Sequence, residues 1–574
     1  MQPENGWFQL ESQPPVKSAA TDNKRIISSW PAERPNQPKA GAAVNTSPYG
    51  HTYAPNSPAE NQPANRTPPA QQNANLTMTR MPCATGDRKA PAAPDENRRP
   101  AVPNAPNAAM EQKSTPKENA PDNVKQWASF NWADDMALHT RHAQTVGARG
   151  PVVLQDSILH EALEIFIHAK IPERPVHTKG FGAFGSFQTT NSMSEYTALP
   201  FLQSPGQQVP VMVRFSFAVS TKGTPDTARN VRGFSTKFYA REGVFDLLCN
   251  HIPVLFVRDG IRFPEAITSL APSPVSNLID PNRFWEFVAR APEAIHFITW
   301  LYSDVGTVKS FRHINGHSVN TYVWKNADGV RRYVKYHWAP LAGEETIDRE
   351  EATRLAGLNP DIAGQDLYDA IASGHPVQYE LRVQLMDPQD EASLPYDPLD
   401  CTKVWDEQQY PMIPVGRMTL NRNPDNFMEQ VEKVAFSPTN LLDGAELSDD
   451  KLLQARANIY WDSQRHRLGE DFRSIPVNDQ KNWTPDDLIT SGAGLHVEGQ
   501  LVRSELPDPD NFSQAGQRYL FLSAAQQDHL VDNLAADLAL VSPSVRNVIL
   551  TYLSTASEEL GRRVAEQITV YMNR

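Results

Sequence analysis

The chain has 574 residues, a net charge of −13 at pH 7 and a pI near 5.6, and this acidic balance without a basic patch argues against a nucleic-acid partner. Its three cysteines, Cys83, Cys249 and Cys401, are too far apart to form a metal-ligand motif or a disulfide framework. No run of 18 apolar residues predicts a membrane span, and no basic and then apolar leader predicts secretion, so we expect a cytoplasmic protein with no membrane association.

The first 121 residues hold twenty of the 48 prolines, together with many Asn, Ala, Gln and Ser residues. They show no sustained apolar periodicity, and they have too few Leu, Ile and Val residues to offset the entropy of ordering the chain. We therefore predict three parts: a disordered extension over residues 1–123, a folded core over 124–500 and a helical C-terminal domain over 501–574.

The core starts with a helical pattern and continues with strands. Apolar residues repeat at helical spacing from Ile158 to Ile167, and Pro172 ends the pattern. Later, "KNADGV" between two runs of β-branched and aromatic residues indicates a hairpin, and the window 283–304 is typical of a helix. Because strands and helices do not alternate regularly, we predict an α+β fold, an antiparallel sheet or barrel with helices around it. The predicted strands lie within residues 208–220, 232–240, 243–257, 317–338, 379–386 and 413–421.

The last 74 residues read as three or four amphipathic helices. Ser523 and Gln526 have the spacing of a capping box, and Ser542-Pro543 is typical of a helix start. We find no catalytic motif in this part and interpret it as a packing domain.

One helix, within "LSDDKLLQARANIYWDSQRHRLGED" at 447–471, has an unusual composition on one face. Ser448 can cap it and Gly469 can end it. At 100° per residue, Arg456, Tyr460 and Arg467 fall within about 40° of one another, and Gln464 within about 80° of Arg456.

Leu452 and Ile459 flank this stripe, which indicates that the face is buried. Buried arginines need an anionic partner, and nothing on the face supplies one, so carboxylates of a ligand would fit. Positive charge beside the phenol also favours its ionised form. A tyrosinate beside ligand carboxylates suits a tyrosine-ligated haem, for which catalase is the established example.

The chain resembles the haem catalases of the small-subunit, monofunctional type in six segments that occur in the family's order and spacing. The resemblance implies an eight-stranded antiparallel β-barrel with surrounding helices, a buried protohaem with its iron, and a homotetramer. It also implies disproportionation of hydrogen peroxide to water and oxygen, which protects the cell from oxidative stress. The six segments are "RPVHTKGFGAFGSF", "VRFSF", "RGFSTKFY", "CNHIPVLFVRDGIRFP", "KVWDEQQYPMIPVGRMTLNRNP" and "RANIYWDSQRHRLG".

The motif positions imply a catalytic group and a cofactor-binding group. For catalysis, the resemblance makes His177 the acid and base, Asn250 the amide beside it, and Ser216 the hydroxyl that orients His177. For the haem, it makes Tyr460 the iron ligand and Arg456 the cation that keeps Tyr460 ionised. The other cofactor-binding residues that it implies are the propionate clamps Arg174, Arg214 and Arg467, the stacked ring of Phe263, and Val176.

Several positions depart from the family's pattern. Phe217, Ala218 and Leu255 stand near the substrate pocket where Thr, Val and Phe are usual. Asn230 replaces the aspartate of the channel, so we expect a weaker field on the substrate there, and Asn320 replaces a histidine on the side of Tyr460. The dinucleotide site of many small-subunit catalases keeps His296 but has Val305, Ala339 and Glu407 in place of cationic residues, so we expect no bound NADPH.

Two other functions stay open at this level. The first is a haem peroxidase or peroxide lyase of the same fold that acts on organic hydroperoxides, although Val176 before His177 follows the catalase pattern rather than the Thr of allene oxide synthases. The second is a haem-binding or partner-binding protein that acts through its N-terminal extension. Release of oxygen from hydrogen peroxide without an organic donor separates catalase from both.

Overall fold

A computed structural model describes residues 142–478, 499–504, 506 and 510–573 of the chain. These residues fall into two compact units that meet in sequence at Glu164 and Ile165. The predicted extension over residues 1–123 lies outside the described residues. Among the helices of the described part, none is long and apolar enough to span a membrane.

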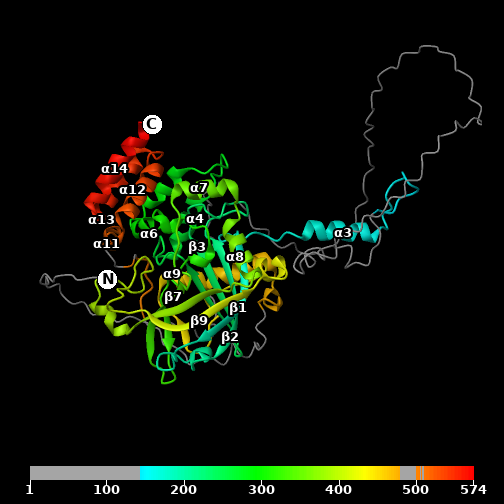
Figure 1. The fold of residues 1–574 in the computed structure, drawn as a ribbon, viewed down its shortest axis with the longest axis horizontal. Coiled ribbons are helices and arrows are strands. Elements are labelled where there is room, and N and C mark those ends of the chain that lie inside the picture. Colours follow the sequence, from blue (N-terminus) through cyan, green and yellow to red (C-terminus); the bar gives the residue numbers. More distant parts are fainter. Residues whose placement is uncertain (1–141, 479–498, 505, 507–509, 574) are drawn as a thin grey trace, which may run out of the picture. The chain divides into compact units, whose positions relative to one another are not determined.

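The centre of the second unit is a closed barrel of eight antiparallel strands, as predicted (Figure 1). The ring runs β7-β5-β4-β3-β2-β1-β9-β8, and β8 pairs back with β7. Strands β6 and β10 extend the sheet from the edge of β7. The strands are β1 Gly180–Thr189, β2 Gln208–Phe217, β3 Arg232–Tyr239, β4 Val244–Asn250, β5 Gly316–His317, β6 Tyr322–Lys325, β7 Arg331–Pro340, β8 Val377–Met386, β9 Ile413–Arg422 and β10 Ala445–Leu447.

Rings from several strands fill the inside of the barrel, so it is a packed core. Phe234 stacks on Trp338 with ring centroids 5.9 Å apart and meets Tyr379 edge-on at 4.8 Å. Phe215 lies 4.7 Å from Phe234, and all four side chains are almost completely buried. Because neighbouring residues of a strand point to opposite faces, Ser216 lies on the outside of the barrel, toward the helices and loops that cover it.

The sequence analysis missed strand β1, which is rich in glycine. Glycine is depleted in strands, yet here it permits a close approach to β9. A Cβ atom on Gly185 would lie 1.8 Å from the carbonyl oxygen of Thr419. The expected "KNADGV" hairpin does join β6 to β7, with Gly329 at φ +81°.

Apart from the helix at residues 157–168, the helices lie around the barrel and in a group beyond one side of it (Figure 1). The window 283–304 contains two helices rather than one, because Pro292 interrupts it between α5 and α6. The helices are α3 Ser157–His168, α4 Phe263–Leu270, α5 Pro281–Ala289, α6 Ala294–Leu301, α7 Arg349–Leu358, α8 Ile362–Ala372, α9 Lys451–Leu468, α11 Ser513–Phe521, α12 Ala524–Leu538, α13 Pro543–Ala556 and α14 Glu558–Met572.

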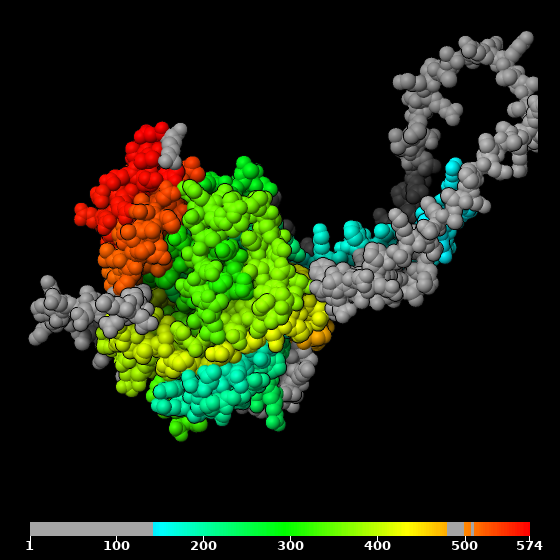
Figure 2. All heavy atoms as spheres, viewed as in Figure 1, coloured from blue at the N-terminus to red at the C-terminus, as the bar shows by residue number. Residues whose placement is uncertain are grey.

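The four C-terminal helices share an apolar core with α5 and α6, and Figure 2 shows them, orange to red, directly against the green part of the chain. The capping box of Ser523 and Gln526 is present at the start of α12, and Pro543 is the first residue of α13. The C-terminal helices therefore extend the core of the α5–α6 layer instead of forming a separate lobe.

Candidate active site

Three neighbouring strands carry the residues of one side of the site in a single row. Ser216 of β2 pairs with Gly233 of β3, which in turn pairs with Asn250 of β4. Residues paired in this way project to the same face of the sheet. The hydroxyl of Ser216 and the amide of Asn250 thus flank a position that has no side chain.

The ring of His177 occupies the space that Gly233 leaves open. Its Nδ1 lies 3.0 Å from the hydroxyl of Ser216, and its main-chain N–H donates to the carbonyl oxygen of Ala218 at 2.9 Å. A Cβ atom on Gly233 would lie 2.5 Å from the Ser216 oxygen and 2.7 Å from Nδ1. Gly233 is therefore part of the site, although the sequence analysis gave it no role.

The backbone and the protonation state of His177 are both unusual. Its φ of +61° is in the left-handed region, where strained residues of functional sites are often found. Burial, with help from Arg214, Arg456 and Arg174, lowers the pKa of His177 to about 3. The imidazole is thus neutral at pH 7. Within the described residues its Nε2 makes no hydrogen bond, so this nitrogen is available to a substrate.

Helix α9 carries the residues on the other side of the site, and its cap differs from the prediction. Asp450, not Ser448, caps the helix, because its Oδ1 accepts from the N–H groups of Leu452 and Leu453 at 2.9 and 3.0 Å. Ser448 instead donates to the carbonyl oxygen of Thr321. Gly469 ends the helix with φ +90°, as expected. Ile459 is 54% exposed, so the prediction that it flanks a buried stripe was wrong.

A chain of hydrogen bonds links the cap of α9 to Tyr460. The Asn320 amide donates to Asp450 Oδ2 at 2.7 Å and accepts from Arg456, whose other terminal nitrogen donates to the Tyr460 hydroxyl at 3.0 Å. Burial opposes the charge on Arg456, but the phenols of Tyr460 and Tyr322 outweigh it and raise its pKa. These bonds therefore hold a permanent cation against the phenol. Val319, next to Asn320, is a β-branched residue with φ +63°, which is a strained conformation.

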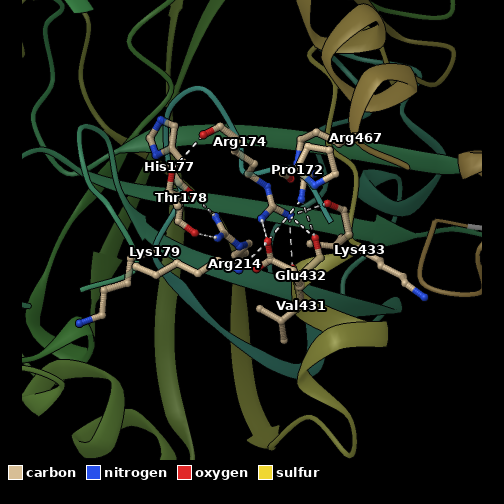
Figure 3. Close-up of polar contacts among 12 residues, drawn as sticks. Pro172, Arg174, His177, Thr178, Lys179, Arg214, Val431, Glu432, Lys433 and Arg467 are labelled. Atoms are coloured by element: carbon tan, nitrogen blue, oxygen red, sulfur yellow. Dashed lines mark hydrogen bonds and ion pairs between the residues drawn. The ribbon is translucent and has the colours of Figure 1, made fainter. Parts of the chain in front are cut away.

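Three arginines from distant segments meet beside this helix (Figure 3). Main-chain carbonyls position them: Arg214 donates to His177 and Thr178, and Arg174 and Arg467 both donate to Glu432. The carboxylate of Glu432, at the end of the short π-helix Met428–Glu432, lies 3.6 Å from Arg174 and 3.5 Å from Arg467. The anion that the face of α9 lacks therefore comes in part from a different segment of the chain.

The arginine cluster fits a ligand with two carboxylates. Burial lowers the pKa of Arg214 only to about 10, so it stays charged at pH 7. Two of the three guanidinium groups lie within 4 Å of the single carboxylate of Glu432, so among the described residues the cluster keeps about two positive charges without a buried counterion. The buried Arg174 Nη1 and Arg214 Nε have no hydrogen-bond partner in the described residues. A haem, with two propionates, would supply both the charge and the acceptors.

The remaining predicted cofactor contacts, Phe263 and Val176, lie near the ends of secondary structure elements. Phe263 is the first residue of α4, and its ring stacks on Phe256 at 5.8 Å. Val176 is half-buried, one residue before His177. Their contact with a cofactor stays a prediction.

Asn230 has a different environment from the one expected. Its Oδ1 accepts from the N–H of Val219 at 3.3 Å, and its Nδ2 donates to the carbonyl oxygen of the same residue. Val219 follows Ala218, which holds the main chain of His177. The amide is thus committed to the main chain next to His177, and an aspartate could not make both bonds. Phe217, another departure, is completely buried beneath Arg232.

The histidine that remains of the dinucleotide site is fully bonded inside the protein. His296 Nδ1 bonds to the carbonyl oxygen of Thr402 at 2.9 Å, and its Nε2 accepts from Trp300 Nε1 at 3.2 Å. The guanidinium of Arg518, from α11, lies 3.2 Å above the centre of the Trp300 ring. No ring nitrogen of His296 is left for a ligand.

Comparisons with known proteins agree with this geometry. Residues 133–496 match the family model "Catalase", and residues 505–568 match "Catalase-related immune-responsive". The chain is 39% identical to catalase isozyme A of Oryza sativa subsp. japonica over 469 residues, 76% of this chain and 94% of the relative. It is also 39% identical to catalase-1 of Arabidopsis thaliana over 459 residues, 75% of this chain and 93% of the relative.

Solved structures are similar over the same share of the chain. Catalase A from Saccharomyces cerevisiae superposes with a TM-score of 0.71 at 32% identity, covering 75% of this chain and 96% of that one. A bacterial catalase gives a TM-score of 0.71 at 35% identity, covering 75% and 93%.

Proposed function

Because this chain belongs to the catalase family and is an enzyme that decomposes hydrogen peroxide, we propose that the reaction takes place at a haem held between His177 and Tyr460. The observation that carries the assignment is the arginine cluster. Arg174, Arg214 and Arg467 exceed the one carboxylate of Glu432 by about two charges, and two of their buried nitrogens make no hydrogen bond within the described residues. These three side chains would bind the propionates, and the phenol of Tyr460 would bind the iron.

The haem, when bound, supplies the iron at which the O–O bond of peroxide breaks. His177 moves the proton that this cleavage requires. Its neutral Nε2 takes a proton from one peroxide oxygen and returns it to the other, while Ser216 holds Nδ1 and keeps the ring oriented. Asn250 can hold the substrate through its amide, which does not titrate. Over the full reaction two molecules of hydrogen peroxide give two of water and one of oxygen.

Arg456 serves the opposite side of the cofactor. Its guanidinium donates to the Tyr460 hydroxyl and lies 5.3 Å from the centre of the ring, so a positive charge lies beside the oxygen that would bind the iron. Asn320 and Asp450 hold Arg456 in this position. The amide of Asn320 does not titrate, whereas burial raises the pKa of Asp450 to about 6, so any pH dependence of this link comes from Asp450.

We further propose that NADPH does not bind, that the haem is protohaem, and that the chain forms the homotetramer of the small-subunit type. The bonded His296 and the missing cations at Val305 and Ala339 support the first proposal. The homotetramer is proposed from membership of the catalase family. The cytoplasmic location stays a prediction, as do the boundaries of the core at 124–500 and of the C-terminal domain at 501–574.

Oxygen release by the purified protein tests the proposal. With hydrogen peroxide alone, we expect one oxygen for every two peroxides and a haem absorption spectrum in the wild type. Tyr460→Phe should lose that spectrum, because phenylalanine cannot bind iron, whereas Tyr552→Phe, on α13, should keep it. Peroxide consumption that needs an organic donor would instead indicate a peroxidase, and a normal haem spectrum in Tyr460→Phe would refute the assigned ligand.

A further inference from the structure

Glu432 has a position that no part of the proposed reaction explains. It is 2% exposed, it comes from the π-helix Met428–Glu432, and its carboxylate faces Arg174 and Arg467. The exposed Lys222 lies 3.8 Å from the same oxygen. A carboxylate placed where the carboxylates of a ligand would bind must either assist that ligand or compete with it.

The carboxylate is not needed to position the arginines. Arg174 donates to three main-chain carbonyls, those of Val431, Glu432 and Val434, at 3.3, 2.8 and 3.0 Å. Arg467 donates to the carbonyl oxygens of Pro172 and Glu432, both at 3.1 Å. These bonds remain if the side chain of residue 432 loses its charge.

The distances from the carboxylate itself indicate attraction without strong hydrogen bonds. At 3.5 and 3.6 Å, the contacts with Arg467 and Arg174 exceed the 2.7–2.9 Å of a charge-assisted hydrogen bond. What Glu432 contributes is therefore mainly charge. Inside a protein this charge is weakly screened, so it lowers the positive potential that the cluster offers to any other anion.

We propose that Glu432 is an internal counterion that competes with the two haem carboxylates for Arg174 and Arg467, and so determines how firmly the cofactor is retained. The inference rests on the proposed haem site. In the haem-free chain, Glu432 offsets the repulsion between the buried arginines. In the loaded protein it becomes a third carboxylate among three guanidinium groups.

Removal of the charge should therefore destabilise the haem-free protein and strengthen its hold on the haem. Both changes favour retention of the cofactor. Glu432→Gln keeps the shape of the side chain, leaves the haem-free protein with three unbalanced arginines and gives the propionates a more positive site. We expect haem loss to excess apomyoglobin to slow about tenfold, and the haem-free variant to unfold at a lower temperature. Glu429→Gln is the matched control, because Glu429 lies on the same π-helix but its carboxylate is half exposed and pairs with Lys433.

A modified cofactor shows whether the propionates carry the effect. Chains produced without haem are reconstituted with protohaem or with protohaem dimethyl ester, whose carboxylates are blocked. We expect the difference between Glu432→Gln and wild type with protohaem only. If Glu432→Gln does not fold, Glu432→Asp, which withdraws the charge by one methylene, should slow protohaem loss to a smaller degree.

The outcomes are distinct. Slower loss of protohaem with no change for the ester supports competition. Unchanged or faster loss of protohaem, or the same change with the ester, overturns the inference and assigns Glu432 a purely structural role. A wild-type protein that binds no haem would instead overturn the proposed function on which the inference rests.

Discussion

The imidazole of His177 and the cluster of three arginines lie in the same buried region but differ in charge. Burial lowers the pKa of His177 from 6.5 to about 3, and it lowers that of Arg214 from 12.5 to about 10. His177 is therefore uncharged at pH 7, whereas Arg214 remains charged. The same physical effect therefore gives a neutral proton carrier beside a cationic anchor, because the two side chains start from different pKa values.

Removal of the imidazole should have the largest effect on activity. His177→Ala should keep the arginine cluster, and hence the haem, but lower oxygen release by about 10²- to 10⁴-fold, the usual contribution of a positioned proton carrier. His251, the next histidine in the sequence near the site, cannot replace it, because it bonds to the N–H of Arg232 and the carbonyl oxygen of Val305.

The exposed His375→Ala is the control for His177→Ala and should be fully active. Haem content and oxygen release are measured for both variants. Activity of His177→Ala within tenfold of wild type, with matched haem, would refute the assignment.

Crowding of the imidazole should have the next largest effect. In Gly233→Ala the new Cβ atom would meet Ser216 Oγ at 2.5 Å and His177 Nδ1 at 2.7 Å, so the ring must move. Small misplacement of a catalytic group can cost about 10²-fold in rate, and we expect kcat to fall by about that factor with haem content unchanged. Gly357→Ala in α7, where a Cβ atom meets nothing within 4 Å, should leave kcat as it is. Equal kcat values in the two variants would show that the ring does not need this space.

Loss of Asn320 should remove one of the hydrogen bonds that position Arg456 beside Tyr460. Asn320→Leu leaves Arg456 Nη1 and Asp450 Oδ2 without their partner, and each hydrogen bond to a charged group contributes about 1.5–3 kcal/mol. We expect a lower unfolding temperature, a shifted haem spectrum and about tenfold less activity. Asn547→Leu, on the exposed face of α13, should change none of these. An unaltered spectrum in Asn320→Leu would mean that Arg456 is held by other contacts.

The pH dependence separates His177 from an exposed histidine. The pKa of His177 is below its unfolded value of 6.5, so His177 itself should cause no loss of oxygen release as the pH falls from 7 to about 5. Burial raises the pKa of Asp450 to about 6, so a smaller change centred near pH 6 would come from the Asp450–Asn320–Arg456 chain. The unfolded chain takes up a proton between pH 6.5 and about 3 that the folded chain does not, so stability falls over that window. The hydrogen bond that His529 donates to the carboxylate of Asp304 raises the pKa of His529, so its contribution has the opposite sign: it is complete below pH 6.5 and is lost at higher pH.

Rate and stability are measured against pH in wild type and in His529→Gln. We expect His529→Gln to lose stability at low pH only and to keep the wild-type rate profile. A rate that falls by half near pH 6.5 in wild type would contradict the neutral, buried His177.

The smallest expected effect is that of Asn230→Asp. The sequence alone suggested that a carboxylate here would strengthen the field on the substrate. The structure gives a reason to expect the opposite, because Asp cannot donate to the carbonyl oxygen of Val219 and would place a negative charge against it. We expect oxygen release at low peroxide to fall by about threefold or less. An increase at low peroxide concentration would restore the channel-field interpretation.

Most residues of the candidate site could be named from the sequence, because the side chains themselves carry the signal. His177, Ser216, Arg456 and Tyr460 follow from motifs and from the periodicity of α9, and the structure brings them into the expected pairs. The role of Gly233 could not be predicted in this way, since it contributes an empty space rather than a functional group.

Glu432 was missed for a different reason. Its partners Arg174 and Arg467 come from the loop before β1 and from α9, so only the folded chain shows that they share one carboxylate. Strand β1 was missed because its glycines, which lower strand propensity, are needed for contact with β9 across more than 200 residues of sequence. Gly233, Glu432 and strand β1 were thus missed because their roles depend on long-range contacts.

Neutron diffraction from crystals of the haem-loaded protein grown in D₂O at about pH 5 tests the central contrast most directly. At that pH an imidazole with the ordinary value of 6.5 would be mostly charged. We predict one deuteron on the His177 ring, on a single nitrogen, and fully deuterated guanidinium groups on Arg174, Arg214 and Arg467. Deuterons on both ring nitrogens of His177 would contradict the account, because a charged imidazole could not accept the proton of the peroxide.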